Sequence, residues 1–230
     1  MEINIKQNKY YKIYLILFIL SLNFLSKNSK AQNHSGEFWL AYINSISINE
    51  NWKIWNDYHY VYHGFSIVRP GITYQTAKGT KFTAGYAFVS ASTPLTNQLK
   101  RKENRYWAQM IKSFQFNPKL RYIIRLRYDA RFRNSLTESG ELLKGESTYN
   151  NRYRIMQDFR FTINETSASS YWHLDLVNET LYNTGKSISN GLDQIRSYLL
   201  LGYTKPEITI LTGYHQRLVP SNTVNYTMNH

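Results

Sequence analysis

The clearest pattern in this chain is an alternation of apolar and charged side chains over residues 120–133. Apolar residues stand at every even position of this segment, and arginines and one aspartate stand on the other parity. Only a β-strand places alternate residues on opposite faces, whereas a helix would spread the arginines around its whole circumference. The alternation lasts about 14 residues, which is longer than the usual strand of a globular protein. The segment is therefore predicted to be a long strand with one apolar and one charged face.

The same period of two recurs along the chain. Residues 82–88, 152–161 and 172–179 each set aromatic or aliphatic side chains on one parity against smaller or charged side chains on the other. No helical periodicity competes with this pattern after residue 31. The pattern predicts ten strands, near residues 36–48, 51–63, 65–76, 80–90, 104–116, 119–134, 150–164, 170–182, 193–204 and 206–215.

The predicted connections alternate in length. The turns after the first, third, fifth, seventh and ninth strands are short and polar, whereas the segments near 91–103, 135–149, 183–192 and 216–225 are longer. In outer-membrane barrels the short turns face the periplasm and the long loops face outward. Tyrosine and tryptophan also crowd the predicted strand ends, as in the aromatic girdles at the two lipid interfaces.

These features predict an all-β fold, an antiparallel up-and-down transmembrane β-barrel of about 10–12 strands. A secreted soluble β-sandwich that acts as a binding module is the alternative, but its strands are usually about five or six residues long. Pro70 lies inside the third predicted strand, so we expect a bulge or a rim position there. The tenth strand would end on the outer side, so either a last strand is missing from this sequence or the strand count is off by one.

The N-terminal residues have the layout of a secretory signal peptide. Three lysines within the first 12 residues precede an apolar run over residues 13–25, and Ser29-Lys30-Ala31 offers a cleavage site. The run is about 13 residues long, whereas a spanning helix needs about 20. We therefore predict a cleaved signal peptide, residues 1–31, followed by a barrel domain, residues 32–230, located in the bacterial outer membrane.

Composition narrows the functional classes. The chain has no cysteine, which excludes disulfide frameworks, cysteine-based zinc sites and thiol nucleophiles. Aromatic residues make up 16% of the chain while the mean hydropathy is −0.50, which excludes a helical protein that crosses a membrane several times. The formal net charge is +13, but five lysines and one glutamate lie within residues 1–31, so the exported chain carries +9. An exported protein does not encounter the cell's DNA, so we predict no nucleic-acid partner.

The strongest candidate site is the charged face of the predicted strands. An arginine at the lipid-facing midplane would cost about 2–4 kcal/mol, so these side chains are expected to point into the barrel lumen. Neighbouring strands lie about 4.8 Å apart, which lets opposite charges pair across the sheet. The predicted lumen cluster comprises Arg121, Arg125, Arg127, Asp129, Arg131, Arg133, Arg152, Arg154, Asp158, Arg160, Asp175 and Glu179.

Two interpretations of this cluster stay open. A salt-bridged filling would stiffen a narrow barrel. Eight arginines against four carboxylates would instead leave a positive excess, typical of a narrow, weakly anion-selective, porin-like pore or a pocket for small anionic solutes. Lys100, Arg101 and Lys102 could also hold anionic lipid head groups at the rim. The expected partners are outer-membrane lipid and, during biogenesis, the barrel-assembly machinery.

An outer-membrane lipid hydrolase or deacylase is the alternative function. It would use His59 and His63, which lie near Ser66 in the sequence, with Asp57 as the acidic partner. Both histidines share one parity of a single strand, so we favour the interpretation that they are tolerated on a hydrated face or rim. No segment has the spacing of a metal site or of a phosphate-binding glycine loop. We therefore predict no enzymatic activity, no metal and no cofactor.

Short motifs follow one another along the chain in a recognisable order. They are Arg69-Pro70-Gly71-Ile72-Thr73-Tyr74, Gly85-Tyr86-Ala87-Phe88, Glu103-Asn104-Arg105-Tyr106-Trp107-Ala108-Gln109, Asn151-Arg152-Tyr153-Arg154, Gly202-Tyr203 and Gly213-Tyr214. Together they resemble the Bacteroidetes outer-membrane family called domain of unknown function 2490. The chain departs from that pattern at Asn104 and Ala108, where the family has His and Gln, and it stops before the family's usual closing strand. The resemblance implies an outer-membrane β-barrel and no assigned reaction.

Overall fold

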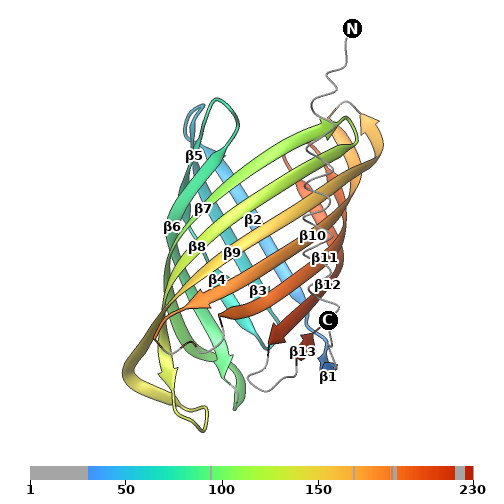
Figure 1. The fold of residues 1–230 in the computed structure, drawn as a ribbon. Helices are drawn as coiled ribbons and strands as arrows, with labels where there is room; N and C mark the ends of the chain where they lie inside the picture. Colours follow the sequence, from blue (N-terminus) through green and yellow to red (C-terminus); the bar gives the residue numbers. More distant parts are fainter. Residues whose placement is uncertain are drawn as a thin grey trace.

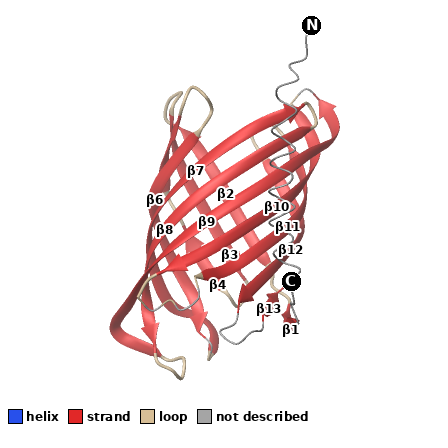
Figure 2. Ribbon diagram, in the orientation of Figure 1, coloured by secondary structure: helices blue, strands red, loops and turns tan. Residues whose placement is uncertain are grey.

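In the computed structural model the described residues are 31–93, 95–167, 169–186, 188, 191–220 and 226–229. The predicted signal peptide lies outside these ranges apart from its last residue, Ala31. Within them the chain consists of strands joined by turns (Figure 2), and no helix there is long and apolar enough to cross a membrane. The predicted all-β class is therefore confirmed.

The described residues form thirteen strands in a single sheet. They are β1 (Ala31–Ser35), β2 (Trp39–Ser47), β3 (Trp52–Val61), β4 (Phe65–Val68), β5 (Gly71–Gln75), β6 (Lys81–Thr93), β7 (Thr96–Asn117), β8 (Leu120–Leu136), β9 (Leu142–Ser167), β10 (Ser170–Thr184), β11 (Leu192–Thr204), β12 (Thr209–Pro220) and β13 (Tyr226–Asn229). All ten predicted strands are present, the third as the pair β4 and β5. The short strands β1 and β13 were not predicted, because no alternation marks them.

From β2 to β12 the sheet is an antiparallel up-and-down meander, with β4 and β5 sharing one place between β3 and β6. The meander curls until its first and last strands, β2 and β12, approach each other (Figure 1). The Trp39 ring of β2 lies 4.5 Å from the His215 ring of β12, and Glu37 forms an ion pair with Arg217. In the described part of the chain, side chains rather than a backbone ladder join these edges. Beyond β12, β13 and β1 pair with each other in parallel.

The connections differ from the prediction at one rim. The short turns after β2, β5, β7, β9 and β11 are present. The predicted loops 91–103 and 135–149 are wrong, because β6 and β7 are separated only by residues 94–95 and β8 and β9 only by residues 137–141. The long hairpin of β8 and β9 projects beyond the rest of the sheet (Figure 1). Most side chains over residues 144–149 are exposed on both faces, which removes the apolar face that would mark a strand in the sequence.

Pro70 interrupts the third predicted strand without shifting its register. The pairs that β4 and β5 form with β6 follow one constant register on both sides of it. The expected bulge or rim position is therefore wrong. The Pro70 carbonyl still accepts a hydrogen bond from the Tyr86 backbone N–H at 3.2 Å. Gly85 makes this close approach feasible, because a Cβ atom there would overlap the Pro70 carbonyl.

The two faces of the sheet have opposite character. On β8, Leu126 is 39% exposed on the outer face, whereas Arg127 and Asp129 are 3% and 0% exposed on the inner face. The outer face carries exposed aliphatic and aromatic side chains, and most buried side chains of the inner face are polar or charged. Two packed sheets with apolar inner faces, as in a sandwich, would show the reverse arrangement. The predicted alternation is confirmed, and the sandwich is not the fold.

Candidate functional site

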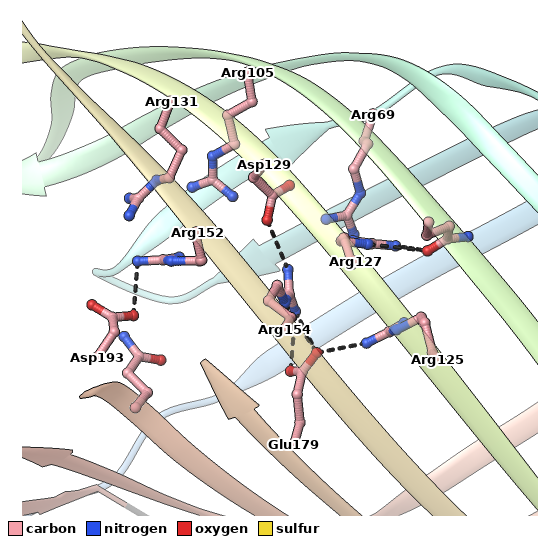
Figure 3. A network of polar contacts seen from close by, with 12 residues as sticks. Arg69, Arg105, Arg125, Arg127, Asp129, Arg131, Arg152, Arg154, Glu179 and Asp193 are labelled. Atoms are coloured by element: carbon pink, nitrogen blue, oxygen red, sulfur yellow. Dashed lines mark hydrogen bonds and ion pairs between the residues drawn. The ribbon is translucent and has the colours of Figure 1, made fainter. Parts of the chain in front are cut away.

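All twelve residues of the predicted lumen cluster lie on the inner face. The register of β8 with β9 places Arg127 opposite Arg154 and Asp129 opposite Arg152, and that of β9 with β10 places Arg160 opposite Asp175. Residues directly opposite each other in an antiparallel pair point to the same face. The curled sheet therefore gathers side chains from strands that are far apart in the sequence into one interior network (Figure 3).

Glu179 of β10 is the most heavily paired carboxylate of the interior network. It accepts hydrogen bonds from Arg154 Nε and NH2 at 3.0 Å each and from Arg125 NH2 at 2.7 Å. Arg196 NH1 lies 3.6 Å away on the neighbouring strand. The Glu179 side chain is only 2% exposed, so three guanidinium groups converge on a carboxylate that water scarcely reaches. Such charge-assisted bonds are the strong ones, and the two-pronged Arg154 contact also fixes their geometry.

A second group lies towards the rim where β6–β7 and β8–β9 turn back. Glu103 accepts hydrogen bonds from Arg105 Nε at 2.6 Å and from Arg131 Nε at 2.5 Å. Arg152 forms an ion pair with Asp193 at 2.8 Å. Two of the predicted arginines thus pair with carboxylates, Glu103 and Asp193, that the sequence prediction did not include.

The middle of the interior is packed but incompletely hydrogen-bonded. Asp129 is fully buried, and neither of its carboxylate oxygens accepts a hydrogen bond from a residue that the structure describes. Its nearest cation is Arg154, with NH1 at 3.9 Å (Figure 3). Arg127 donates to the Gln109 side-chain oxygen and lies over the Trp107 ring, 5.0 Å from its centroid. Buried polar atoms of this kind are the usual places for ordered water in a protein interior.

At the short-turn end, a chain of hydrogen bonds crosses from β9 to β11. Arg160 donates to both carboxylate oxygens of Asp175. Asp175 Oδ1 also lies 2.7 Å from His173 Nδ1, and His173 Nε2 lies 3.1 Å from the Thr204 hydroxyl. A hydroxyl, an imidazole and a carboxylate in this order are the components of an acyl-transfer triad. However, His173 is fully buried, and its partner Asp175 also forms an ion pair with Arg160. This arrangement favours a structural crosslink between the strands.

Beside this chain, a polar cavity of about 270 Å³ opens near the short turns. Arg121 lines it and donates from Nε to the Gln115 side-chain oxygen at 2.9 Å. Asp158, also from the predicted cluster, has Oδ2 at 4.0 Å from Arg160. Arg133 lies near the opposite rim, and its Nε finds no hydrogen-bond acceptor among the described residues. Arg121 and Arg133 thus mark the two ends of the network.

Of the residues in the hydrolase hypothesis, His59 and Ser66 lie on opposite faces, and His63 lies in the turn between β3 and β4. His59 faces inward and lies 3.1 Å from Asp57, which also accepts two hydrogen bonds from Arg69. Ser66 pairs with Tyr60 on the outer face, because its neighbour Ile67 is the residue that is buried inside. Since a nucleophile must lie within hydrogen-bonding reach of its base, the serine and His59 cannot form a catalytic pair across the sheet.

The deeply buried charges nearly balance. Among the described residues, seven arginines and six carboxylates are buried. The arginines are Arg69, Arg105, Arg127, Arg131, Arg152, Arg154 and Arg196, and the carboxylates are Asp57, Glu103, Asp129, Asp158, Asp175 and Glu179. Four arginines of the predicted cluster, Arg121, Arg125, Arg133 and Arg160, are only partly buried, so the excess of eight arginines over four carboxylates does not lie in the deeply buried part of the network.

Three of these partners escaped the sequence prediction for a common reason. Glu103 and Arg105 share their face with Trp107, and Asp57 shares its face with Trp55 and Val61. Because aromatic and aliphatic side chains also occupy the inner face here, the parity of these strands does not separate apolar from charged residues. Trp107 is the residue that could have indicated a charged inner face on this strand, because Arg69 and Arg127 lie over its ring.

A protein-family model described as "Protein of unknown function (DUF2490)" matches residues 36–228. The match spans every residue of the interior network. Comparisons with curated proteins and with solved structures found no match.

Proposed function

The chain belongs to the DUF2490 family of proteins of unknown function, and we propose that it is an integral β-barrel of the bacterial outer membrane whose interior is closed by paired charges. In this proposal the signal peptide exports the chain, the barrel-assembly machinery inserts it, and the short turns face the periplasm. Its role is structural rather than catalytic.

The outer face supports the membrane location. Large apolar side chains are exposed on it from β2 to β12, among them Ile72 at 55%, Ile155 at 51% and Ile210 at 60%. Soluble monomers seldom expose apolar patches larger than a few hundred Å². Lipid would cover this surface, while the charges on the inner face avoid the cost of about 2–4 kcal/mol for an arginine at the bilayer midplane.

The single observation that carries the closed interior is the burial of arginines on the inner face. Arg127 and Arg131 are each 3% exposed and Arg154 is 8% exposed, although all three belong to the face that would line a pore. An open aqueous channel would hydrate these guanidinium groups. Carboxylates and amide groups from neighbouring strands surround them instead, which ties the strands of the sheet together.

A narrow anion pathway is the second candidate, and the position of the unbalanced arginines favours it. Arg121 and Arg133 lie towards opposite ends of the network, and neither has a carboxylate within ion-pair distance among the described residues. Cations at both ends would attract small anionic solutes. Such a pathway would require the middle of the network to rearrange.

Two experiments test these proposals. Alkaline extraction of cell membranes should leave the chain in the membrane pellet, and release without detergent would contradict the membrane location. Planar bilayers that contain the folded full-length protein should show no conductance steps. Steady anion-selective steps that lose their selectivity in the Arg125→Glu, Arg127→Glu double variant would replace the closed barrel with the anion pathway.

A further inference from the structure

The outer face carries a shallow apolar groove of about 630 Å³ across β3, β5, β6, β7, β8 and β9. Its floor is formed by Ala84 and Ala108, which lie directly opposite each other in the β6–β7 pair. On neighbouring strands the same row contains larger residues, Ile72 on one side and Tyr128 on the other. Two small side chains between large ones create a depression that a flat sheet would not have.

Aromatic pairs form the two side walls of this groove. Trp52 and Tyr74 have ring centroids 5.0 Å apart on one side, and Tyr128 and Tyr153 have ring centroids 5.4 Å apart on the other. Trp52 is 45% exposed. The groove is thus lined mainly by hydrocarbon between aromatic rings, which suits an acyl chain.

A cation stands at the short-turn end of the groove. Along β7 the outward-facing positions run from Ala108 through Met110 to Lys112. Two residues of a strand span about 7 Å, so the Lys112 backbone lies just beyond Met110, which lines the groove. The Lys112 ammonium group donates to the Lys78 carbonyl in the β5–β6 turn and lies 6.0 Å from the Phe114 ring centroid. An ammonium group has three N–H donors, so this contact leaves donors for an anionic ligand.

We propose that this groove holds one anionic phospholipid, with an acyl chain over Ala84 and Ala108 and the phosphate on Lys112. The inference rests on the proposed membrane location. With the short turns on the periplasmic side, the lipid comes from the periplasmic leaflet. A hydrocarbon-lined groove that ends in a cation matches both parts of such a lipid, whereas a neutral protein surface would leave Lys112 without a counter-charge.

Trp52 provides a built-in reporter for the experiment, and Trp172 provides its control. Both lie on the outer face, at 45% and 40% exposure, but Trp172 is on β10, outside the groove. The full-length protein is reconstituted with phospholipids that carry brominated acyl chains, which quench nearby tryptophan fluorescence. The other three tryptophans, Trp39, Trp55 and Trp107, lie on the inner face, away from acyl chains. The Trp172→Phe variant therefore reports on Trp52, and the Trp52→Phe variant reports on Trp172. Anionic phosphatidylglycerol and zwitterionic phosphatidylcholine compete in each sample.

Trp52 should prefer the anionic lipid about fivefold, as expected for one lysine near a lipid phosphate, and Trp172 should show no preference. Lys112→Gln should abolish the preference at Trp52, while Lys119→Gln, which removes an exposed charge from the same rim, should keep it. Ala108→Leu should reduce quenching at Trp52 by filling the groove.

The alternative outcomes separate the two proposals. If neither tryptophan is quenched, the membrane location itself is wrong. If both are quenched without lipid preference, the membrane location stands and the specific lipid site is refuted. If Trp172 is quenched and Trp52 is shielded from both lipids, another protein chain covers the groove, which also refutes the lipid site.

Discussion

The substitution Glu179→Gln tests whether the interior network holds the sheet together. Glu179 is 2% exposed and faces Arg125, Arg154 and Arg196. Glutamine has nearly the same shape, so the change removes the negative charge and little else. Three guanidinium groups would then surround a neutral amide in a region that water scarcely reaches.

The expected cost follows from the three hydrogen bonds at 2.7–3.0 Å. Bonds to charged groups contribute about 1.5–3 kcal/mol each, which would total more than 4 kcal/mol, but the glutamine oxygen still accepts at least one of them. Breaking a buried ion pair by removing one partner typically costs about 3–5 kcal/mol. We therefore expect Glu179→Gln to lower the free energy of unfolding by about 3–5 kcal/mol.

The measurement is equilibrium unfolding in urea, in detergent micelles, followed by tryptophan fluorescence. Glu138→Gln is the matched control, because Glu138 is exposed in the β8–β9 turn and its loss should change stability by less than about 0.5 kcal/mol. The double variant Glu179→Gln, Arg154→Gln should lose less free energy of unfolding than the sum of the losses in the two single variants, because it leaves one unpaired cation fewer than Glu179→Gln alone. A loss below about 1 kcal/mol, or strictly additive losses, would refute the reasoning.

Two other substitutions test the β4–β5 region. Gly85→Ala should reduce the folded yield, because the added methyl group would overlap the Pro70 carbonyl, whereas Gly36→Ala points into open space and should not. Equal yields for the two variants would contradict the close approach at Pro70. Asp57→Asn should lower the free energy of unfolding by about 3–5 kcal/mol, because Arg69 is buried with that carboxylate as its partner. Urea unfolding measures this change, and a loss no larger than that of the exposed Glu138→Gln would argue against the pair.

The sequence determined the strands that have one apolar and one charged face. Over residues 120–133 the period of two specified a strand whose arginines share one face, because a strand cannot place neighbours on the same face. This local pattern placed the twelve residues of the predicted cluster on one face of the sheet. It failed where side chains on both faces are exposed, as over residues 144–149, because a polar strand has no period to detect.

The pairings were decided only by the tertiary structure. Arg125 and Glu179 are 54 residues apart, and Arg131 and Glu103 are 28 residues apart, so the register of several strands had to be known before either contact could be assigned. Glu103 escaped the sequence prediction because its strand also carries Trp107 on the inner face, so parity there does not separate apolar from charged residues. Periodicity predicts which face of the sheet a side chain occupies, whereas pairing between side chains depends on the register of each strand with its neighbours.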